Sequence, residues 1–181
     1  MDMSVFKDDD GQAYVLYATN VKPESGLWID KLSSDYLSIL SNVSCPSPHK
    51  REAPCMMKKD GVYYLCYSQC TGWWPNQSYF TTATSLGGPW APERVFGDST
   101  TFDSQGAWIL PVVGKSGTVF IYVGDRWNFT GNAAAHDFRM SFDVSEYVLL
   151  PVEANGGEMS VEYYDRWLLD IESGSWSPGR N

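Results

Sequence analysis

The sequence predicts an all-β protein whose strands are arranged as part of a β-propeller. The first observation is a pattern that occurs three times, in which a polar turn with a glycine is followed by a run of β-branched and aromatic residues. The second is its spacing, since Gly11, Gly61 and Gly117 lie 50 and 56 residues apart. The third is the near absence of helical periodicity. A period near 50 residues, made of short strands and turns, is typical of propeller blades.

Each repeat begins with a predicted β-hairpin. The turn of each hairpin and the strand that follows it are expected over residues 8–17, 58–67 and 114–123. Asp10-Gly11 and Asp60-Gly61 are strong hairpin signals, because glycine adopts the positive φ that such tight turns need. Further strands are expected over residues 26–29, 79–83, 138–142, 159–164 and 166–170. Only residues 30–40 leave both helix and strand open.

The number of repeats bears on the domain organisation. Propellers close with roughly four to eight blades, so three repeats do not complete a ring. The first hairpin also lies only a few residues from Met1. We therefore expect residues 1–181 to form one partial propeller, the C-terminal part of a larger domain, whose exposed apolar blade faces favour self-association. The alternative is a β-sandwich with accidental repeats, although sandwiches lack a matched period of this length.

Composition and charge exclude several classes of partner. The 181 residues include 13 Lys and Arg against 22 Asp and Glu, which gives a net charge of −9. Nucleic acids and anionic membranes both need a basic face on a protein partner, so neither is expected. No apolar run approaches the roughly 18 residues that span a bilayer. The first residues also lack the order of basic and apolar segments that a signal peptide has.

Cysteines and glycosylation motifs favour a secreted parent protein. The even set of cysteines has no zinc-site spacing and comprises Cys45, Cys55, Cys66 and Cys70. Asn-x-Ser/Thr motifs begin at Asn42, Asn76 and Asn128. Together they favour an extracellular location with glycan on at least one motif and oxidised cysteines. The alternative is that the thiols are free and the motifs occur by chance.

Arg51-Glu52-Ala53-Pro54 is the most informative local motif. Glu52 is expected at the start of a strand, and Pro54, which has no N–H to donate, indicates that this part of the strand is not fully paired. Strand starts near a propeller axis face the central cavity. A carboxyl crowded there by aromatic rings would have a raised pKa and could act as a general acid. The alternative is a surface glutamate paired with Arg51.

Other candidate residues follow the second and third hairpins. Trp73 and Trp74 lie between a glycine and a proline in a predicted loop. Their indole rings could stack on the apolar faces of sugar rings, or they could be ordinary core residues. Gln105 precedes a strand and is most simply a polar strand residue. Asp125 and Arg126 end the third hairpin, where they could serve a central cavity or form a structural ion pair.

Together these residues resemble glycoside hydrolase family 43, whose members are five-bladed propellers, and within it the exo-β-1,3-galactanase branch. The resemblance runs along nearly the whole chain. It rests on Asp2-Met3, Phe6-Lys7-Asp8-Asp9-Asp10-Gly11, Arg51-Glu52-Ala53-Pro54, Gly61-Val62-Tyr63-Tyr64-Leu65, Cys70-Thr71-Gly72-Trp73, Gly88-Pro89-Trp90, Ser104-Gln105 and Gly124-Asp125-Arg126-Trp127. It implies exo-acting hydrolysis of β-1,3-galactan, the arabinogalactan backbone, by an inverting mechanism without a cofactor or metal.

The resemblance also implies roles for individual residues. Glu52 matches the general acid, and Asp2 matches the carboxylate that orients this acid and tunes its pKa. Gln105 matches a glutamine that positions the attacking water, where most members use an aspartate of the first blade. Thr71 and Gly72 match positions near bound galactose. The same pocket is expected to be lined by Trp73, Asn76, Asp125 and Trp127.

The sequence departs from the family pattern in two places. The first two blades and their site residues are missing, and residues 22–26 stand where the branch tends to carry asparagines. Three functions are therefore compared: a galactan hydrolase, a catalytically incomplete propeller fragment that only binds carbohydrate, and an unrelated interaction module. The joint presence of Asp2, Glu52 and Gln105 argues against the third.

Overall fold

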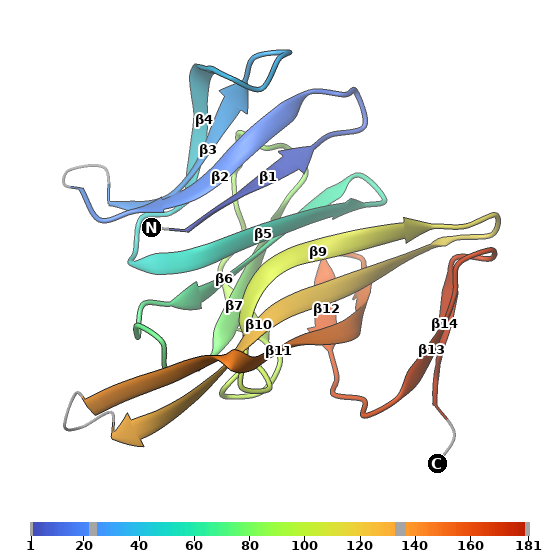
Figure 1. Cartoon of the computed structure of the whole chain (residues 1–181). Coiled ribbons are helices and arrows are strands. Elements are labelled where there is room, and N and C mark those ends of the chain that lie inside the picture. Colours follow the sequence, from blue (N-terminus) through green and yellow to red (C-terminus); the bar gives the residue numbers. More distant parts are fainter. Residues whose placement is uncertain (1, 22–24, 133–136, 180–181) are drawn as a thin grey trace.

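The chain folds into antiparallel β-sheets arranged in a fan. The computed structural model describes residues 2–21, 25–132 and 137–179. Within these ranges it contains three four-stranded sheets, whose strands follow sequence order, and one two-stranded sheet. Over the same ranges there is no helix of the length and apolar character needed to cross a membrane. Figure 1 shows the three larger sheets one after another, from blue through green to orange.

The strand bounds are as follows. The first sheet contains β1 (Met3–Lys7), β2 (Ala13–Thr19), β3 (Gly26–Leu32) and β4 (Ile39–Ser47). The second contains β5 (Arg51–Lys59), β6 (Val62–Gln69), β7 (Ser78–Ala83) and β8 (Arg94–Phe96). The third contains β9 (Gln105–Val113), β10 (Thr118–Asn132), β11 (Asp137–Asn155) and β12 (Glu158–Val161). The two-stranded sheet pairs β13 (Trp167–Asp170) with β14 (Ser175–Pro178).

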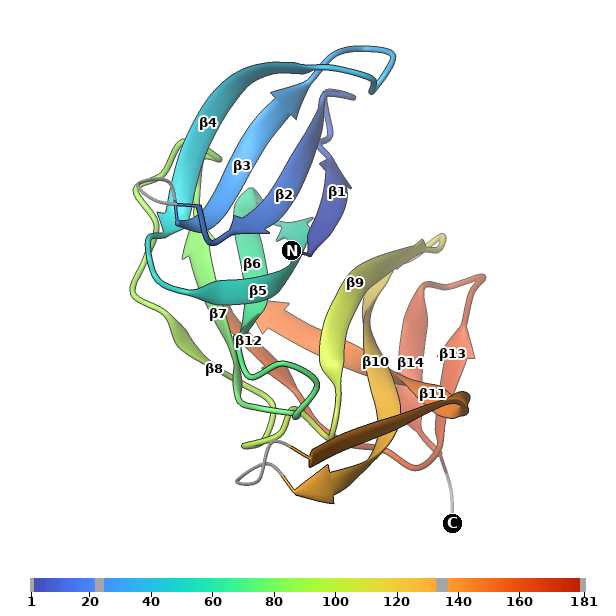
Figure 2. The ribbon, with the colours of Figure 1, turned by 60° about the vertical axis from the view of Figure 1, so that its left-hand side comes forward.

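This arrangement confirms the predicted partial propeller. Each repeat forms one four-stranded sheet, and the predicted hairpins are β1–β2, β5–β6 and β9–β10. In Figure 2 the first strands β1, β5 and β9 lie at the sides of their sheets that face one another, as the inner strands of blades do. The ambiguous residues 30–40 are strand and turn. The last two predicted strands do not share a sheet, because β12 completes the third sheet whereas β13 pairs with β14.

Two hydrophobic clusters hold the sheets together. The larger lies between the second and third sheets and includes Tyr64, Phe80 and Tyr122, each 1% exposed. The other lies between the first and second sheets and includes Leu16 and Leu65. Burial of large aromatic and aliphatic side chains between neighbouring sheets is the main source of stability for such blades.

Adjacent lysines at the end of β5 tie the second sheet to both neighbours. The Nζ of Lys58 lies 2.6 Å from Asp8 Oδ1 and 2.8 Å from Asp9 Oδ2, in the first sheet's hairpin. The Nζ of Lys59 donates to the Ala154 carbonyl of β11 at 2.5 Å. Successive residues of a strand point to opposite faces, so two neighbours in sequence reach two different sheets.

A cleft of about 700 Å³ runs along the inner strands β1, β5 and β9. Its lining is largely apolar and includes Met3, Val5, Met56 and Trp108. Met3 is 67% exposed and Trp108 is 54% exposed. Exposed apolar side chains thus line the central cleft, while the apolar outer blade faces and self-association stay predictions.

The four cysteines are free thiols, so the expectation of oxidised cysteines is wrong for this structure. Cys55 and Cys66 are buried partners across the β5–β6 pair, where they act as small apolar core residues. The structure also argues against a glycan at Asn76, because its amide nitrogen already donates to the Gln69 carbonyl and to Thr71 Oγ1. The Asn42 amide donates to Asp30. The side chain of Asn128 lies outside the described residues.

Candidate active site

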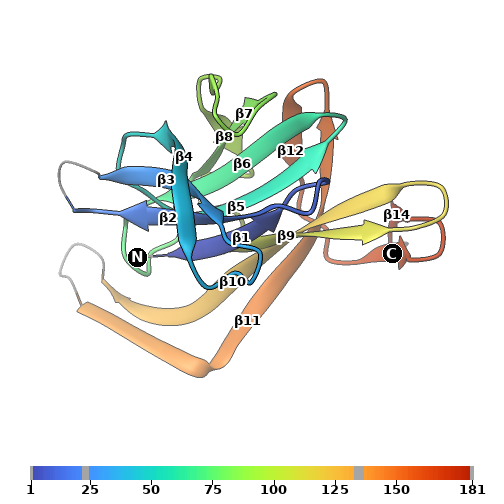
Figure 3. The same cartoon turned by 90° about the horizontal axis from the view of Figure 1, so that it is seen from above.

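The three predicted catalytic residues meet because each lies at the start of an inner strand. Asp2 directly precedes β1, Glu52 is the second residue of β5, and Gln105 is the first residue of β9. The inner strands begin on one side of the molecule, where the long β10–β11 hairpin also extends (Figures 1 and 3). Gln105 Nε2 donates to Glu52 Oε1 at 2.9 Å, and the Ala53 N–H donates to Asp2 Oδ2 at 3.1 Å. The structure therefore brings Asp2, Glu52 and Gln105 into one site.

A bulge at the start of β5 creates this arrangement. The β5–β6 register shifts between Glu52 and Cys55, which confirms that the strand is not fully paired around Pro54. Ala53 adopts a φ of 52°, a left-handed conformation that side chains other than glycine rarely take. This turns its N–H toward Asp2, while the Pro54 carbonyl accepts from Ser4 Oγ at 2.5 Å. Both contacts tie the Glu52 bulge to the first sheet.

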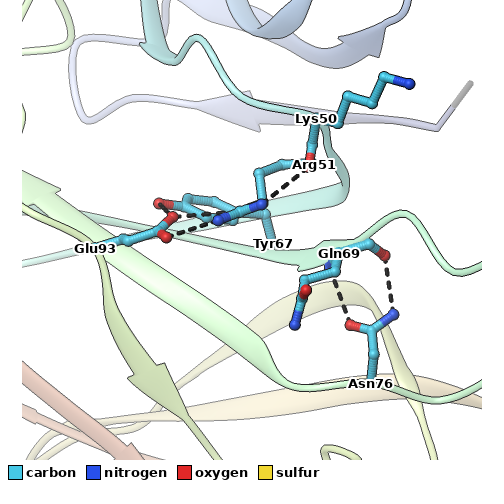
Figure 4. A network of polar contacts seen from close by, with 6 residues as sticks. All are labelled: Lys50, Arg51, Tyr67, Gln69, Asn76 and Glu93. Atoms are coloured by element: carbon cyan, nitrogen blue, oxygen red, sulfur yellow. Dashed lines mark hydrogen bonds and ion pairs between the residues drawn. The ribbon is translucent and has the colours of Figure 1, made fainter.

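Arg51 does not pair with Glu52, so the interpretation of Glu52 as its surface partner is wrong. Arg51 donates to Glu93, from Nη2 at 2.7 Å and from Nε at 3.3 Å. Tyr67 OH also donates to Glu93 at 3.3 Å. Figure 4 shows Arg51 turned to Glu93 and Tyr67 in this network. The Arg51 guanidinium is therefore not placed to stabilise the ionised form of the Glu52 carboxyl.

The surroundings of Glu52 raise the pKa of its carboxyl. Burial is the largest cause, and the negative charge of Asp2 acts in the same direction. Hydrogen bonds from Gln105 and from the Cys70 thiol oppose the rise without cancelling it. A carboxyl with a raised pKa keeps its proton to a higher pH, which is the property that a general acid needs.

Asp125 adds a third carboxyl to this end of the molecule. It lies opposite Gln105 in the β9–β10 register. Burial raises the pKa of Asp125, and the charge of Asp2 adds to the rise. Its neighbour Gly124 admits no side chain, because a Cβ there would lie 2.7–2.8 Å from atoms of Tyr122 and Ser104. Among the described residues no group of His, Cys, Asp or Glu is arranged to hold a metal ion.

The aromatic loop after β6 lies beside Gln105. A small hollow is lined by Trp73, Trp74, Pro75, Asn76, Asp103, Ser104, Gln105 and Trp127. The Trp73 and Trp127 rings meet edge to face, with centroids 5.0 Å apart. Trp73 is 44% exposed, so it is not an ordinary core residue, and with the partly buried Trp74 and Trp127 it lines the hollow next to Gln105.

Thr71 and Asn76 serve the loop itself. Asn76 Oδ1 accepts from the Gln69 N–H at 3.0 Å, and its amide nitrogen donates to the Gln69 carbonyl (Figure 4). The same amide nitrogen also donates to Thr71 Oγ1. Thr71 Oγ1 donates to the Trp74 carbonyl at 2.6 Å. Gly72 has a φ of 65°, with open space where a Cβ would be. In this conformation both side chains fix the loop that carries Trp73.

Sequence reasoning missed two residues of the site. Ser68 Oγ accepts a second bond from Gln105 Nε2 at 2.9 Å, and Ser68 lies opposite Glu52 in the β5–β6 register. A β5–β6 register predicted from the hairpin turn would have placed Ser68 opposite Glu52. Asp103 lines the hollow from a turn with positive φ, for which the sequence has no signal. Residues 22–24, within the segment that departs from the galactanase branch, lie outside the described residues.

Comparisons with known proteins identify the family. A model of glycosyl hydrolases family 43 matches residues 1–111. An exo-β-1,3-galactanase from Clostridium thermocellum is 37% identical over 98% of this chain and 37% of its own, with a TM-score of 0.85. An exo-β-1,3-galactanase from Phanerochaete chrysosporium, solved with β-1,3-galactotriose, is 30% identical over 98% of this chain and 39% of its own, with a TM-score of 0.82.

The chain thus spans 37% and 39% of the length of these two structures. No curated protein matches it. The family model nonetheless covers more than half of the chain, and the fold is shared along nearly all of it. From the three inner-strand residues, the bulge at Glu52 and these comparisons, we conclude that the chain belongs to glycosyl hydrolases family 43.

Proposed function

We propose that this protein acts as an exo-β-1,3-galactanase that inverts the anomeric carbon, with Glu52 as the general acid. The observation that carries the proposal is the Glu52 carboxyl itself: its pKa is raised, Arg51 is turned away to Glu93, and Asp2 and Gln105 are beside it. Two similar structures that are exo-β-1,3-galactanases, one of them bound to β-1,3-galactotriose, support this choice of substrate. An extracellular location follows from a polysaccharide substrate and is part of the proposal.

In the proposed reaction Glu52 gives its proton to the leaving glycosidic oxygen as the bond from that oxygen to the anomeric carbon breaks. Water attacks the same carbon from the opposite face and loses one proton to solvent, from which Glu52 regains its own. Asp2 is a positioning residue, since its carboxylate accepts the Ala53 N–H and its charge favours the protonated form of Glu52. Trp73, Trp127 and Asp125 are proposed to line the sugar pocket, with Thr71, Gly72 and Asn76 shaping its loop.

Gln105 needs to leave Glu52 before it can position water. Inverting glycosidases separate the acid from the group that serves the water by roughly 6.5–9.5 Å, which leaves room for the sugar and the water. Here the two side chains share a 2.9 Å hydrogen bond. We therefore propose that the incoming sugar breaks this bond and that Gln105 then holds water on the far side of the anomeric carbon. A neutral amide is a weak base, so its role is placement.

A second candidate is a protein that only binds galactan. The Trp73–Trp127 surface and its hollow favour it, because they depend on the loop after β6 and on β10 and not on a closed ring of blades. Stacking of a sugar ring on an indole face needs no proton donor.

One experiment separates the two candidates. The chain is incubated with β-1,3-galactotriose, release of galactose is followed by proton NMR, and binding is measured by titration calorimetry. We expect α-galactose as the first product, because inversion of a β-linkage gives the α-anomer. Glu52→Gln is expected to lower the rate by about 10²–10⁴-fold while binding persists, and Glu162→Gln, at an exposed position, serves as the control.

Three results would count against the proposal. An unchanged rate in Glu52→Gln would remove Glu52 as the acid, and β-galactose as the first product would remove inversion. Binding of the trisaccharide without any galactose release by the unaltered chain would select the binding protein instead.

A further inference from the structure

The turn just before Gln105 has an uncommon backbone. Thr101, Phe102 and Asp103 have φ values of 51°, 58° and 57°. All three lie in the left-handed region that L-residues rarely adopt, and none of the three is a glycine. A run of such residues persists only where the surroundings hold it, and strain of this kind is concentrated at functional sites.

Buried and short contacts hold the beginning of this turn. Thr101 is fully buried; its Oγ1 accepts from the Ser78 N–H and donates to the Asn76 carbonyl, both at 2.9 Å. Asp98 Oδ1 accepts the N–H groups of Thr100 at 3.0 Å and Phe102 at 2.7 Å. These contacts fix the first part of the turn to the second sheet.

Arg126 holds the middle of the turn from the third sheet. Its Nη2 and Nε both donate to the Phe102 carbonyl, at 2.7 and 3.2 Å. The guanidinium lies 5.6 Å from the centre of the Tyr163 ring, which also contacts Phe102. Arg126 belongs to β10, next to Asp125, the register partner of Gln105. Arg126 and Gln105 therefore lie on neighbouring strands of the third sheet.

The turn leads directly to Gln105. Ser104 Oγ donates to the Thr101 carbonyl at 2.5 Å and also bonds Tyr122 OH at 3.1 Å. Gln105 is the next residue, and its Nε2 reaches Glu52 and Ser68. A displacement of the Phe102 carbonyl would thus be passed on to Gln105 within three residues.

We propose that Arg126 is a positioning residue that holds the left-handed turn at residues 101–103 and thereby aims the Gln105 amide at Glu52. Its value for catalysis rests on the proposed function, but the placement of Gln105 can be measured without turnover. Arg94 makes the same kind of contact elsewhere: its Nη2 donates to the Gly157 carbonyl and its guanidinium lies 4.6 Å from the centre of the Phe80 ring. It provides a matched control.

The test uses NMR titration of the Glu52 carboxyl carbon in the full chain. The Gln105 hydrogen bond lowers the pKa of Glu52 against the effect of burial, so Gln105→Ala should raise it and defines the reference shift. We expect Arg126→Met to give at least half of that shift, and Arg126→Lys, which keeps the positive charge, to give a smaller shift in the same direction. Arg94→Lys should leave the pKa of Glu52 unchanged.

A double-mutant cycle shows whether Arg126 acts through Gln105. In a Gln105→Ala background, Arg126→Lys should shift the pKa of Glu52 no further. Should Arg126→Met fail to fold, Arg126→Lys and its cycle decide alone. The inference is overturned if folded Arg126 variants titrate like the unaltered chain, or if their shift persists without Gln105.

Kinetics give the independent second readout. If the chain hydrolyses β-1,3-galactotriose, Arg126→Lys should lower kcat with KM little changed, because the turn that Arg126 holds also places Gln105 for the attacking water once the sugar has broken its bond to Glu52. Absence of hydrolysis in the unaltered chain would count against the proposed function alone, since the titration of Glu52 would still report the placement of Gln105.

Discussion

The two ends of strand β5 are built in different ways. At its last residues the register with β6 is regular, and Lys58 contacts Asp8 and Asp9 of the neighbouring sheet. At its first residues the register shifts, Ala53 takes a φ of 52°, and Glu52 has no arginine partner. The last residues of β5 thus combine regular geometry with paired charges. Its first residues combine a strained backbone with two neighbouring carboxyls, those of Glu52 and Asp2.

Asp8 and Glu52 show what this difference does to a carboxyl. Burial pushes the pKa of both upward. For Asp8, hydrogen bonds from Lys58 and Tyr63 outweigh burial and the pKa is lowered. For Glu52, the nearby charge is the carboxylate of Asp2, and the pKa is raised. The sign of the nearby charge therefore decides whether the ionised or the protonated form of a buried carboxyl is favoured.

Removal of Lys58 should have the largest effect on stability. Lys58→Met leaves the Asp8 carboxylate, whose side chain is only 10% exposed, without its cation. We expect the free energy of unfolding to fall by about 2–3 kcal/mol, measured by urea denaturation. Lys115→Met is the control, because the Lys115–Glu172 pair spans 3.9 Å with both side chains more than 80% exposed. Lys115→Met should change the free energy of unfolding by less than about 0.5 kcal/mol. Equal losses in the two variants would show that the Lys58 contacts do not stabilise this end of β5.

The pH dependence of stability should separate the two ends with a smaller effect. The lowered pKa of Asp8 gives a contribution that is present above its ordinary value of 3.8 and lost as the pH falls through the folded-state value. The raised pKa of Glu52 works in the other direction. Its contribution is present below the ordinary value of 4.5 and is lost as the pH rises through the folded-state value.

Each end has its own variant for this measurement. In urea denaturation repeated across pH, Asp8→Asn should weaken the loss of stability on the acidic side, and Glu52→Gln should weaken the loss above pH 4.5. Each variant serves as the control for the other. Curves that run parallel to that of the unaltered chain would show that neither carboxyl is linked to folding as described.

The smallest effect is expected at Ala53. Ala53→Gly relieves the strain of the left-handed conformation, but it also increases the conformational entropy of the unfolded chain. The two effects on the free energy of unfolding should cancel to within about 0.5 kcal/mol. The matched control is Ala13→Gly in the regular strand β2, where Ala13 is 1% exposed. That change should cost about 1 kcal/mol or more, because glycine gains nothing there. A loss at Ala53 as large as that at Ala13 would show that the bulge is not strained.

Much of the fold could be predicted because the repeat signal is local. Asp10-Gly11 and Asp60-Gly61 are turns with the positive φ that glycine supplies, and the strands after them are rich in aromatic and β-branched residues. Strands β4 and β8 were not expected. β4 contains Ser, Asn and one proline and is exposed over its first four residues, and β8 has three residues. Their pairing depends on the neighbouring strand more than on their own composition.

Glu52 was a candidate from its own motif, whereas the roles of Asp2 and Gln105 were expected only from the family resemblance. All three occupy equivalent strand starts, so their gathering follows from stacking the blades. The turn at residues 101–103 could not be foreseen, because threonine and phenylalanine do not favour positive φ, and Arg126 and Asp98, which hold the turn, lie outside it. Asn76 looked like a sugar ligand, but its amide is used by its own loop.

The contacts of Lys58 and Lys59 have a consequence for the cooperativity of unfolding. In repeat proteins, units that meet only through their nearest neighbours can unfold one at a time from an end. Here one strand of the middle sheet is fastened to the sheets on both sides, and hydrophobic clusters lie at both of its faces. Opening the middle sheet therefore breaks contacts with both neighbours, whereas opening the first or the third sheet breaks contacts on one side only, so we expect unfolding to begin at an outer sheet and the middle sheet to open last.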